Sequence, residues 1–323
     1  MRVRLGLVRA HSRRRRFVPA FLLLVGAAEA AAAAAPAPDA EGFAAAWCAR
    51  NRATSEPAVI YYNKIGKCGS TTMDALAHQY AGSKGDSATR RVVSLSPKQW
   101  KDGMRDNRGE LERMKHIVRL GVENQGHVFV TGHVYYDPAF LGFGDGVDYG
   151  RFQLFRDCAG HSYSNLVYDI KNADAACLRN LTCVRRVYGA KLAFAARRAL
   201  RFVGGENLTA AASIDHLLNN YTAWGFIDRL SDTLEVLACA FPSYFSPKIE
   251  KKGGAAHERL NACQGATCKP DPDVLAYVDA ELCGAENELL VVARALFDAI
   301  HRRIAGGGAA TCCRAPRNAT VGT

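Results

Sequence analysis

Short apolar runs alternate along the chain with longer segments in which apolar residues recur every three or four positions. The short runs are rich in β-branched and aromatic residues, which is typical of buried strands. The longer segments have the spacing of amphipathic helices, and residues 286–304 place Leu289, Ala293 and Leu296 on one face. This alternation predicts an α/β fold in which helices flank a central parallel sheet. We expect strands at residues 58–62, 92–95, 128–131 and 152–155, and helices at residues 71–80, 109–120, 162–170, 192–200, 231–241 and 286–304.

The first forty residues differ from the rest of the chain. Seven arginines lie within the first sixteen positions, followed by the apolar run 17–28 and an alanine-rich stretch with prolines. This pattern indicates a secretory signal or a signal-anchor, and an Ala-rich tail without a targeting role is the alternative. A retained anchor would make a single-pass type II membrane protein with a lumenal body, whereas a cleaved leader would make a secreted protein. We therefore divide the chain into a leader with its Ala/Pro linker, residues 1–40, and a single domain, residues 41–323.

The formal charge of +11 comes largely from this leader. Without its seven arginines the chain has 35 basic and 31 acidic residues, so the body carries only +4. Such a balance gives no support to a surface that tracks nucleic-acid phosphates, and we expect no nucleic-acid partner. It is compatible with an anionic ligand in one cleft.

Sequons and cysteines indicate the secretory pathway. The acceptor pattern for N-glycosylation occurs at Asn180, Asn207, Asn220 and Asn318. Among the 11 cysteines, the closely spaced pairs predict local disulfides in an oxidising compartment: Cys177 with Cys183, Cys263 with Cys268, and Cys312 with Cys313. The odd number leaves a free thiol or an intermolecular bridge. No spacing fits a zinc site, and we expect no metal.

The segment after the first predicted strand has the features of an anion-binding loop. Residues 63–72 (NKIGKCGSTT) lead from the strand through small residues into a helix, whose N-terminal N–H groups and dipole favour an anion. Lys67 adds a mobile positive charge. A P-loop kinase is one candidate, but Tyr61 stands where the Walker pattern requires its first glycine, and Cys68 stands where a magnesium-binding hydroxyl is required.

Several segments resemble Golgi carbohydrate sulfotransferases, with the heparan sulfate and uronyl 2-O-sulfotransferases as the closest group. Residues 62–71 (YNKIGKCGST) resemble the 5′-phosphosulfate loop YNRxPKTGST, and residues 131–134 (TGHV) resemble the HGHV segment. Residues 155–164 resemble the 3′-phosphate motif IRDPxxRLxS, and residues 223–227 (AWGFI) resemble the LVGVTEEL segment. The helix from Glu286 resembles the family's closing helix. The matches occur in the family's order over residues 58–304.

The chain departs from the family pattern at five of these positions. Lys64 replaces the usual arginine, Gly66 the usual proline and Cys68 the usual threonine of the loop. Cys158 replaces proline in the 3′-phosphate motif, and Thr131 stands where the 2-O-sulfotransferases have a second histidine. The last departure bears on acceptor specificity more than on the reaction.

The resemblance implies the sulfotransferase fold, a P-loop-like parallel sheet flanked by helices, and a reaction. A sulfuryl group would pass from 3′-phosphoadenosine-5′-phosphosulfate, without a metal, to a sugar hydroxyl. We expect the 2-hydroxyl of a uronic acid in an acidic, glycosaminoglycan-like polysaccharide. The family's location implies a Golgi membrane anchor and a lumenal catalytic domain, and it allows a homo-oligomer.

The resemblance also implies roles for particular residues. Lys67 would stabilise the charge on the departing nucleotide, and His133 would take the proton of the acceptor hydroxyl. Arg156 and Ser164 would hold the 3′-phosphate, and Arg259 in the basic stretch 247–261 would cover the donor. The residues expected to bind the donor are Lys67, Cys68 through its backbone N–H, Gly69, Ser70, Thr71, Arg156, Ser164 and Arg259.

Other interpretations remain. A catalytically inactive lumenal carbohydrate-binding protein of the same fold is one alternative, and a P-loop kinase is another. At the level of single residues, His133 could be structural and Arg156 could form a surface ion pair with Asp157. The loop could be a turn capped by Ser70, and the stretch 247–261 a solvated loop.

Overall fold

The computed structural model describes most of the body of the chain. The described residues belong to one compact unit, Pro38–Thr323. They are residues 39–65, 67–69, 72–73, 75–76, 90–94, 116, 119–120, 123, 127–132, 149–169, 175–205, 209–245, 270–307 and 312. Residues 1–38, which hold the predicted leader, lie outside them.

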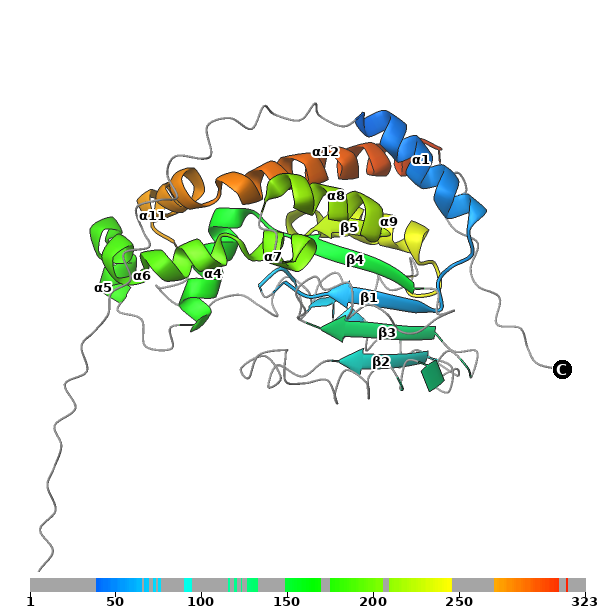
Figure 1. The fold of residues 1–323 in the computed structure, drawn as a ribbon, viewed down its shortest axis with the longest axis horizontal. Helices are drawn as coiled ribbons and strands as arrows, with labels where there is room; N and C mark the ends of the chain where they lie inside the picture. The colour runs from blue at the N-terminus through cyan, green and yellow to red at the C-terminus, as the bar shows by residue number, and fades with distance from the viewer. Residues whose placement is uncertain are drawn as a thin grey trace, which may run out of the picture. The chain divides into compact units, whose positions relative to one another are not determined.

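Five strands among the described residues form one parallel sheet (Figure 1). Their order is β2-β3-β1-β4-β5, and each neighbouring pair is parallel, as the α/β prediction requires. The carboxyl ends of the strands therefore share one edge, where ligands of such sheets bind. The strands are β1 (Val59–Asn63), β2 (Arg90–Ser94), β3 (His127–Gly132), β4 (Tyr149–Phe155) and β5 (Ala223–Phe226).

Helices surround this sheet. Within the described part of the chain, none of them is both long enough and apolar enough to cross a bilayer. The helices are α1 (Ala40–Ala53), α4 (Cys158–Asp169), α5 (Ala175–Leu178), α6 (Leu181–Ala195), α7 (Arg198–Gly204), α8 (Ala210–Asn220), α9 (Leu230–Ala240), α11 (Pro272–Tyr277) and α12 (Gly284–Gly307), with a 3₁₀ turn η3 (Ile227–Arg229) and a π-helical turn η5 (Val278–Leu282).

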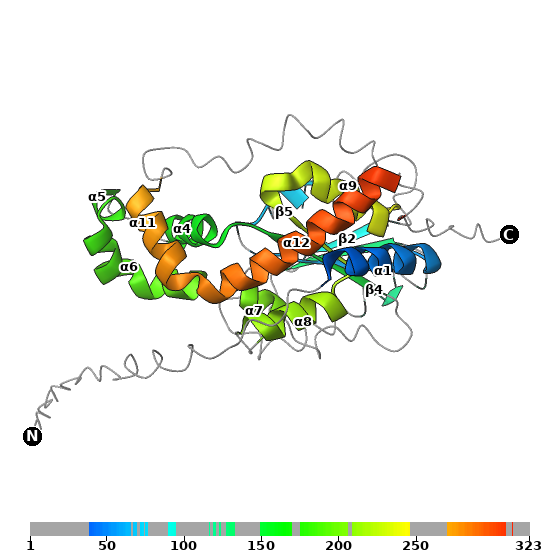
Figure 2. The same cartoon turned by 90° about the horizontal axis from the view of Figure 1, so that it is seen from above.

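Strand β5 shows how helices cover both faces of the sheet. Gly225 faces α9 so closely that an added Cβ would lie 2.1 Å from Cγ2 of Thr233. The neighbouring Trp224 points to the opposite face, because side chains alternate along a strand. Its indole N–H donates to the carbonyl oxygen of Ala293 on α12 at 2.9 Å. Figure 2 shows α9 on one side of α12 and α7 and α8 on the other.

The central strands are buried on both faces. All residues of β1 and β3 are buried, which explains their nearly continuous apolar runs. Tyr62 of β1 stacks on Phe152 of β4, with ring centroids 4.7 Å apart and planes inclined by 7°. Stacked aromatic pairs of this kind add about 0.5–1.5 kcal/mol to the effect of burial. The rigid centre of the sheet thus fixes where the loop after β1 begins.

Most of the elements expected from the sequence are confirmed. The four predicted strands occur as β1 to β4, and the helices at residues 162–170, 231–241 and 286–304 occur as α4, α9 and α12. The helices at 71–80 and 109–120 lie largely outside the described residues. Helices α1 and α8 were not expected.

The predicted single helix at 192–200 is wrong, since α6 ends at Ala195 and α7 begins at Arg198. The carboxylate of Glu286 accepts a hydrogen bond from the backbone N–H of Ala199 at 2.9 Å, which supplies an acceptor at the start of α7. A contact from α12 thus stabilises the new helix start, and no local pattern could reveal it.

The disulfides confirm one predicted pair and correct another. Three bridges have both cysteines within the described residues: Cys48–Cys312, Cys158–Cys283 and Cys177–Cys183. The local bridge Cys177–Cys183 was expected. The pairing of Cys312 with Cys313 was wrong, because α1 packs along α12 and brings Cys48 to Cys312. Cys263 and Cys268 lie outside the described residues.

Candidate functional site

The loop after β1 has the backbone geometry of an anion-binding turn. Lys67 has a φ of 67° and Gly69 a φ of 70°, and Lys67 is the only non-glycine residue with a positive φ in the described part of the chain. Left-handed residues of this kind occur in tight turns and in the backbone nests that bind anions. Only glycine suits position 69, because an added Cβ would also lie 2.4 Å from Cδ1 of Ile227.

Hydrogen bonds fix this loop to the sheet and to the helix that follows. The hydroxyl of Tyr62 donates to the carbonyl oxygen of Cys68 at 3.2 Å. The N–H of Met73 donates to the carbonyl oxygen of Gly69 at 3.0 Å, which begins a helical turn. The N–H of Cys68, which we expected to bind the donor, instead donates to the carbonyl oxygen of Ile65 at 3.2 Å. A ligand would therefore have to share that N–H with the turn.

Arg156 lies beside this loop. It directly follows β4, which neighbours β1 in the sheet, and its Nη1 donates to the carbonyl oxygen of Lys67 at 3.5 Å. Its Nε also lies 3.5 Å from a carboxylate oxygen of the exposed Asp157, so the ion pair considered as an alternative is present as well. The structure thus brings together two of the predicted site residues, Lys67 and Arg156, which are 89 positions apart in sequence.

The amine of Lys67 lies over an aromatic ring on α4. Its Nζ is 3.7 Å from the ring centroid of Tyr168, whose side chain is 66% exposed. This cation–π contact holds the amine at the carboxyl edge of the sheet. Ser164 lies four positions before Tyr168 and therefore on the same face of α4. Tyr168 could not be expected from the sequence, since an isolated tyrosine on a helix has no recognisable pattern.

The remaining predicted site residues lie outside the described residues: His133, Ser70, Thr71 and Arg259. The described part of β3 ends at Gly132, whose carbonyl oxygen accepts a hydrogen bond from the N–H of Lys64 at 2.7 Å. The roles assigned to His133, Ser70, Thr71 and Arg259 stay predictions.

Three buried polar side chains, one from the loop and two from helices, interact with one another. Cys68 is buried and is the free cysteine among the described residues. Its thiol hydrogen-bonds with His161 on α4, and Nδ1 of His161 lies 3.8 Å from a carboxylate oxygen of Glu286 on α12. All three side chains are about 1% exposed. These three side chains connect the loop to α4 and α12. Neither His161 nor Glu286 was expected from the sequence.

These contacts make His161 a strongly basic imidazole. Burial alone would lower its pKa, but the Cys68 thiol and the Glu286 carboxylate outweigh burial and raise the pKa from 6.5 to about 10. His161 is therefore protonated at neutral pH. The Glu286 carboxylate beside it balances this charge, so the buried pair supports the loop without adding a net positive charge to the site.

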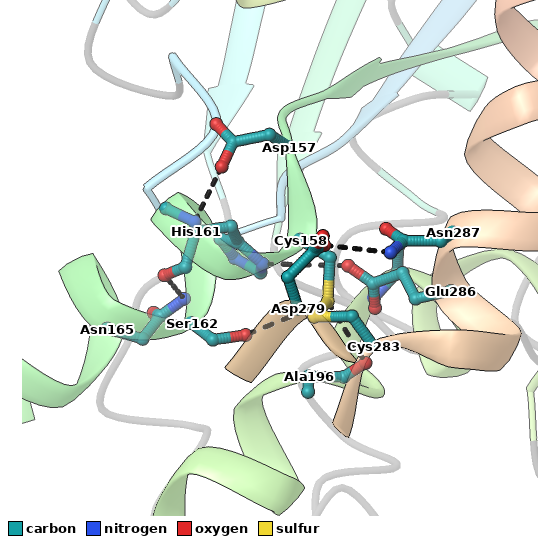
Figure 3. The surroundings of a disulfide bond; sticks show 12 residues. Asp157, Cys158, His161, Ser162, Asn165, Ala196, Asp279, Cys283, Glu286 and Asn287 are labelled. Carbon is teal, nitrogen blue, oxygen red and sulfur yellow. Dashed lines mark hydrogen bonds and ion pairs between the residues drawn. A yellow bond between two sulfur atoms is a disulfide. The ribbon is translucent and has the colours of Figure 1, made fainter. Parts of the chain in front are cut away.

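A disulfide beside the His161–Glu286 pair joins α4 to the start of α12. Cys158 at the start of α4 is bonded to Cys283, which lies just before α12 (Figure 3). Cys158 is one turn before His161, and Cys283 is one turn before Glu286. The second carboxylate oxygen of Glu286 accepts the N–H of Ala199, so this buried anion interacts with the N-terminal turns of both α7 and α12. The disulfide and this hydrogen bond thus connect α4, α7 and the start of α12.

The charges of the site favour an anion with several oxygens. Lys67 and Arg156 provide cations at its surface, and Arg156 can bind two oxygens of one phosphate or sulfate. Among the described residues, no group of three His, Cys, Asp or Glu side chains is placed to hold a metal ion. What the arrangement can do is hold and stabilise a phosphate or sulfate group.

Comparison with known proteins adds no relative. No family model matches the chain, and the search of curated proteins found no match.

Proposed function

We propose that this protein is a carbohydrate O-sulfotransferase with the fold of that family. The observation that supports this best is the meeting of Lys67 and Arg156 beside a loop of left-handed residues. A nucleotide that carries a 5′-phosphosulfate and a 3′-phosphate needs cations at two points of one site. The motifs that resemble the sulfotransferases supply those cations from the ends of two neighbouring strands.

Lys67 has the main chemical role in this proposal. During transfer the bond between sulfur and the bridging oxygen of the donor breaks, and a bond between sulfur and the sugar oxygen forms. The breaking bond leaves its electron pair on the nucleotide phosphate, where the Lys67 amine stabilises the charge. The proton of the sugar hydroxyl passes to a base, for which the sequence offers His133. The products are a sulfate ester and the 3′,5′-bisphosphate nucleotide.

The other residues position the nucleotide. Arg156 binds the 3′-phosphate through its planar guanidinium, and Ser164 donates a hydrogen bond from α4. The exposed ring of Tyr168 holds the Lys67 amine near the developing charge. Positioning of this kind supplies much of the acceleration in group transfer, because little covalent chemistry is required of the protein.

The proposed location is the lumen of the Golgi apparatus, with the leader as a single-pass anchor. The disulfides support an oxidising compartment. The proposed acceptor is a uronic acid hydroxyl in an acidic polysaccharide.

The test is transfer of labelled sulfate from the phosphosulfate donor to a panel of desulfated polysaccharides. We expect transfer by the wild type, and a roughly 100- to 1,000-fold lower rate for Lys67→Ala, because one stabilising contact of the transition state is lost. Arg303→Ala is the matched control, since Arg303 is an exposed cation on α12. No transfer to any acceptor would contradict the proposal.

One observation supports the second candidate, a binding protein without transferase activity. The side chain of Cys68 is directed to buried His161, and the backbone N–H of Cys68 donates within the turn. Neither group is therefore presented to a phosphosulfate nucleotide. Tight binding of 3′,5′-bisphosphoadenosine without any transfer would favour this candidate. Magnesium-dependent binding of ATP in preference to that bisphosphate would instead indicate a kinase.

A further inference from the structure

One segment of the chain has a marked excess of basic residues. Residues 175–205, from α5 to the end of α7, contain seven basic residues and no acidic residue. The body as a whole is nearly balanced in charge, so this local excess is unusual. The seven are Arg179, Arg185, Arg186, Lys191, Arg197, Arg198 and Arg201.

Three of these cations are exposed on α6 and in the connection that follows it. Arg186 and Lys191 lie on α6, about 7.5 Å apart along its axis, and Arg197 lies between α6 and α7. Between them Val187 and Phe194 are 51% and 44% exposed, so this side of the helix is not covered. We call the five residues together the α6 face.

A fourth cation joins this face from α7. The guanidinium of Arg201 lies 4.0 Å from the ring centroid of Phe194. The ring holds the guanidinium in place without neutralising its charge, so Arg201 remains able to bind an anion.

Among the described residues, the acid that pairs with a cation of α6 belongs to the turn η5. Arg185 pairs with Glu281 of η5 at 2.5 Å, and Asp279 of the same turn accepts from Asn287. In the described part of the chain no ion pair involves Arg186, Lys191 or Arg197. The cations of the α6 face are therefore available to an anionic partner.

We propose that the α6 face is a docking surface for an extended acidic polysaccharide. Its exposed cations extend from α6 to α7, which suits a linear polyanion better than a small anion. The oxidising compartment indicated by the disulfides argues against a nucleic acid as the partner. This proposal goes beyond the proposed transferase function, since a polysaccharide could bind here even if no sulfate is transferred.

The position of α6 allows one polysaccharide to reach the candidate site. In both views α6 lies with α4 on the side of the molecule toward which the strands point (Figures 1 and 2). Helix α6 packs on α4, the helix that presents Tyr168 to Lys67. A chain held on the α6 face would thus be kept near the loop after β1.

The test measures binding of a heparin-derived oligosaccharide to the full chain at several salt concentrations. The variant Arg186→Gln/Lys191→Gln/Arg197→Gln removes three charges from the α6 face. The control Arg52→Gln/Arg302→Gln/Arg303→Gln removes three exposed charges from α1 and from the C-terminal end of α12, which lie away from α6 in both views. We expect about tenfold weaker binding and a shallower salt dependence for the first variant only.

Three results would overturn the proposal: equal losses in both variants, no binding by the wild type, or tighter binding of single-stranded DNA than of heparin at physiological salt. Binding of 3′,5′-bisphosphoadenosine by the same variants separates the two proposals. A docking surface predicts that this nucleotide binds the α6-face variant as it binds the wild type.

Discussion

The carboxylate of Glu286 lies 3.8 Å from Nδ1 of His161, and both side chains are almost completely buried. A buried ion pair of this kind costs stability when one partner is removed, because the other charge is left without compensation. Here the pair also supports the thiol of Cys68, so the loop after β1 depends on a charge that no solvent reaches.

Stability should therefore depend on pH through His161. Its pKa is raised from 6.5 to about 10, so the folded state binds the proton more tightly than the unfolded state. The stabilisation is complete below about pH 6.5 and is lost as the pH rises through about 10. We expect the unfolding free energy, measured by urea denaturation, to fall over that range by an amount on the order of 3 kcal/mol.

The variant His161→Gln should be less stable at neutral pH and should lack this part of the pH dependence. His116→Gln, which changes an exposed histidine, is the control. Identical slopes for the wild type and His161→Gln would show that His161 does not titrate in this way.

The left-handed conformation of Lys67 leads to a second prediction. Glycine adopts a positive φ without the steric cost that other residues incur. Lys67→Gly should therefore be about 1 kcal/mol more stable to thermal unfolding than Lys67→Ala, although both variants lack the amine. Both should bind 3′,5′-bisphosphoadenosine poorly. If alanine proves as stable as glycine, the loop is not left-handed at this residue.

Gly69 is constrained by its own φ and by Ile227. The variant Gly69→Ala should have a free energy of unfolding about 1–3 kcal/mol below that of the wild type, because the φ of 70° is strained for alanine and the new Cβ meets Cδ1 of Ile227. Adding Ile227→Val removes that Cδ1 atom and should recover part of the loss. Urea denaturation of the single and double variants measures the recovery. A double variant that is merely the sum of its single losses would exclude the contact.

The disulfide Cys158–Cys283 should contribute more stability than Cys177–Cys183. The two bridges span 125 and 6 residues. Loop-closure entropy then predicts about 5 kcal/mol for the long bridge and about 2 kcal/mol for the short one. Two variants, each with both cysteines of one bridge replaced by serine, would measure the difference by thermal unfolding. Equal losses of stability in the two variants would contradict the dependence on loop length.

Much of the sheet could be predicted from sequence because its strands are buried on both faces. Continuous apolar runs such as residues 128–131 are distinctive, and parallel strands need helices between them. The break between α6 and α7 could not be predicted, since Glu286 interacts with the start of α7 from 87 positions away.

The same limit applies to the candidate site. Lys67 and Arg156 follow strands and could be placed at one edge of the sheet from the order of motifs. His161 and Glu286 could not, because their pairing depends on how α4 and α12 pack. An acidic residue in the first turn of a helix is usually exposed, yet Glu286 is buried.

The bridge Cys48–Cys312 encloses 264 residue positions and thereby the whole sheet. A protease that cuts within this span leaves two fragments joined, so they would migrate apart only after reduction. A truncated form that stops at the end of α12 would lack Cys312 and leave Cys48 without its partner. Such a form should accumulate as covalent dimers in air, so shortened versions of this protein should retain residue 312.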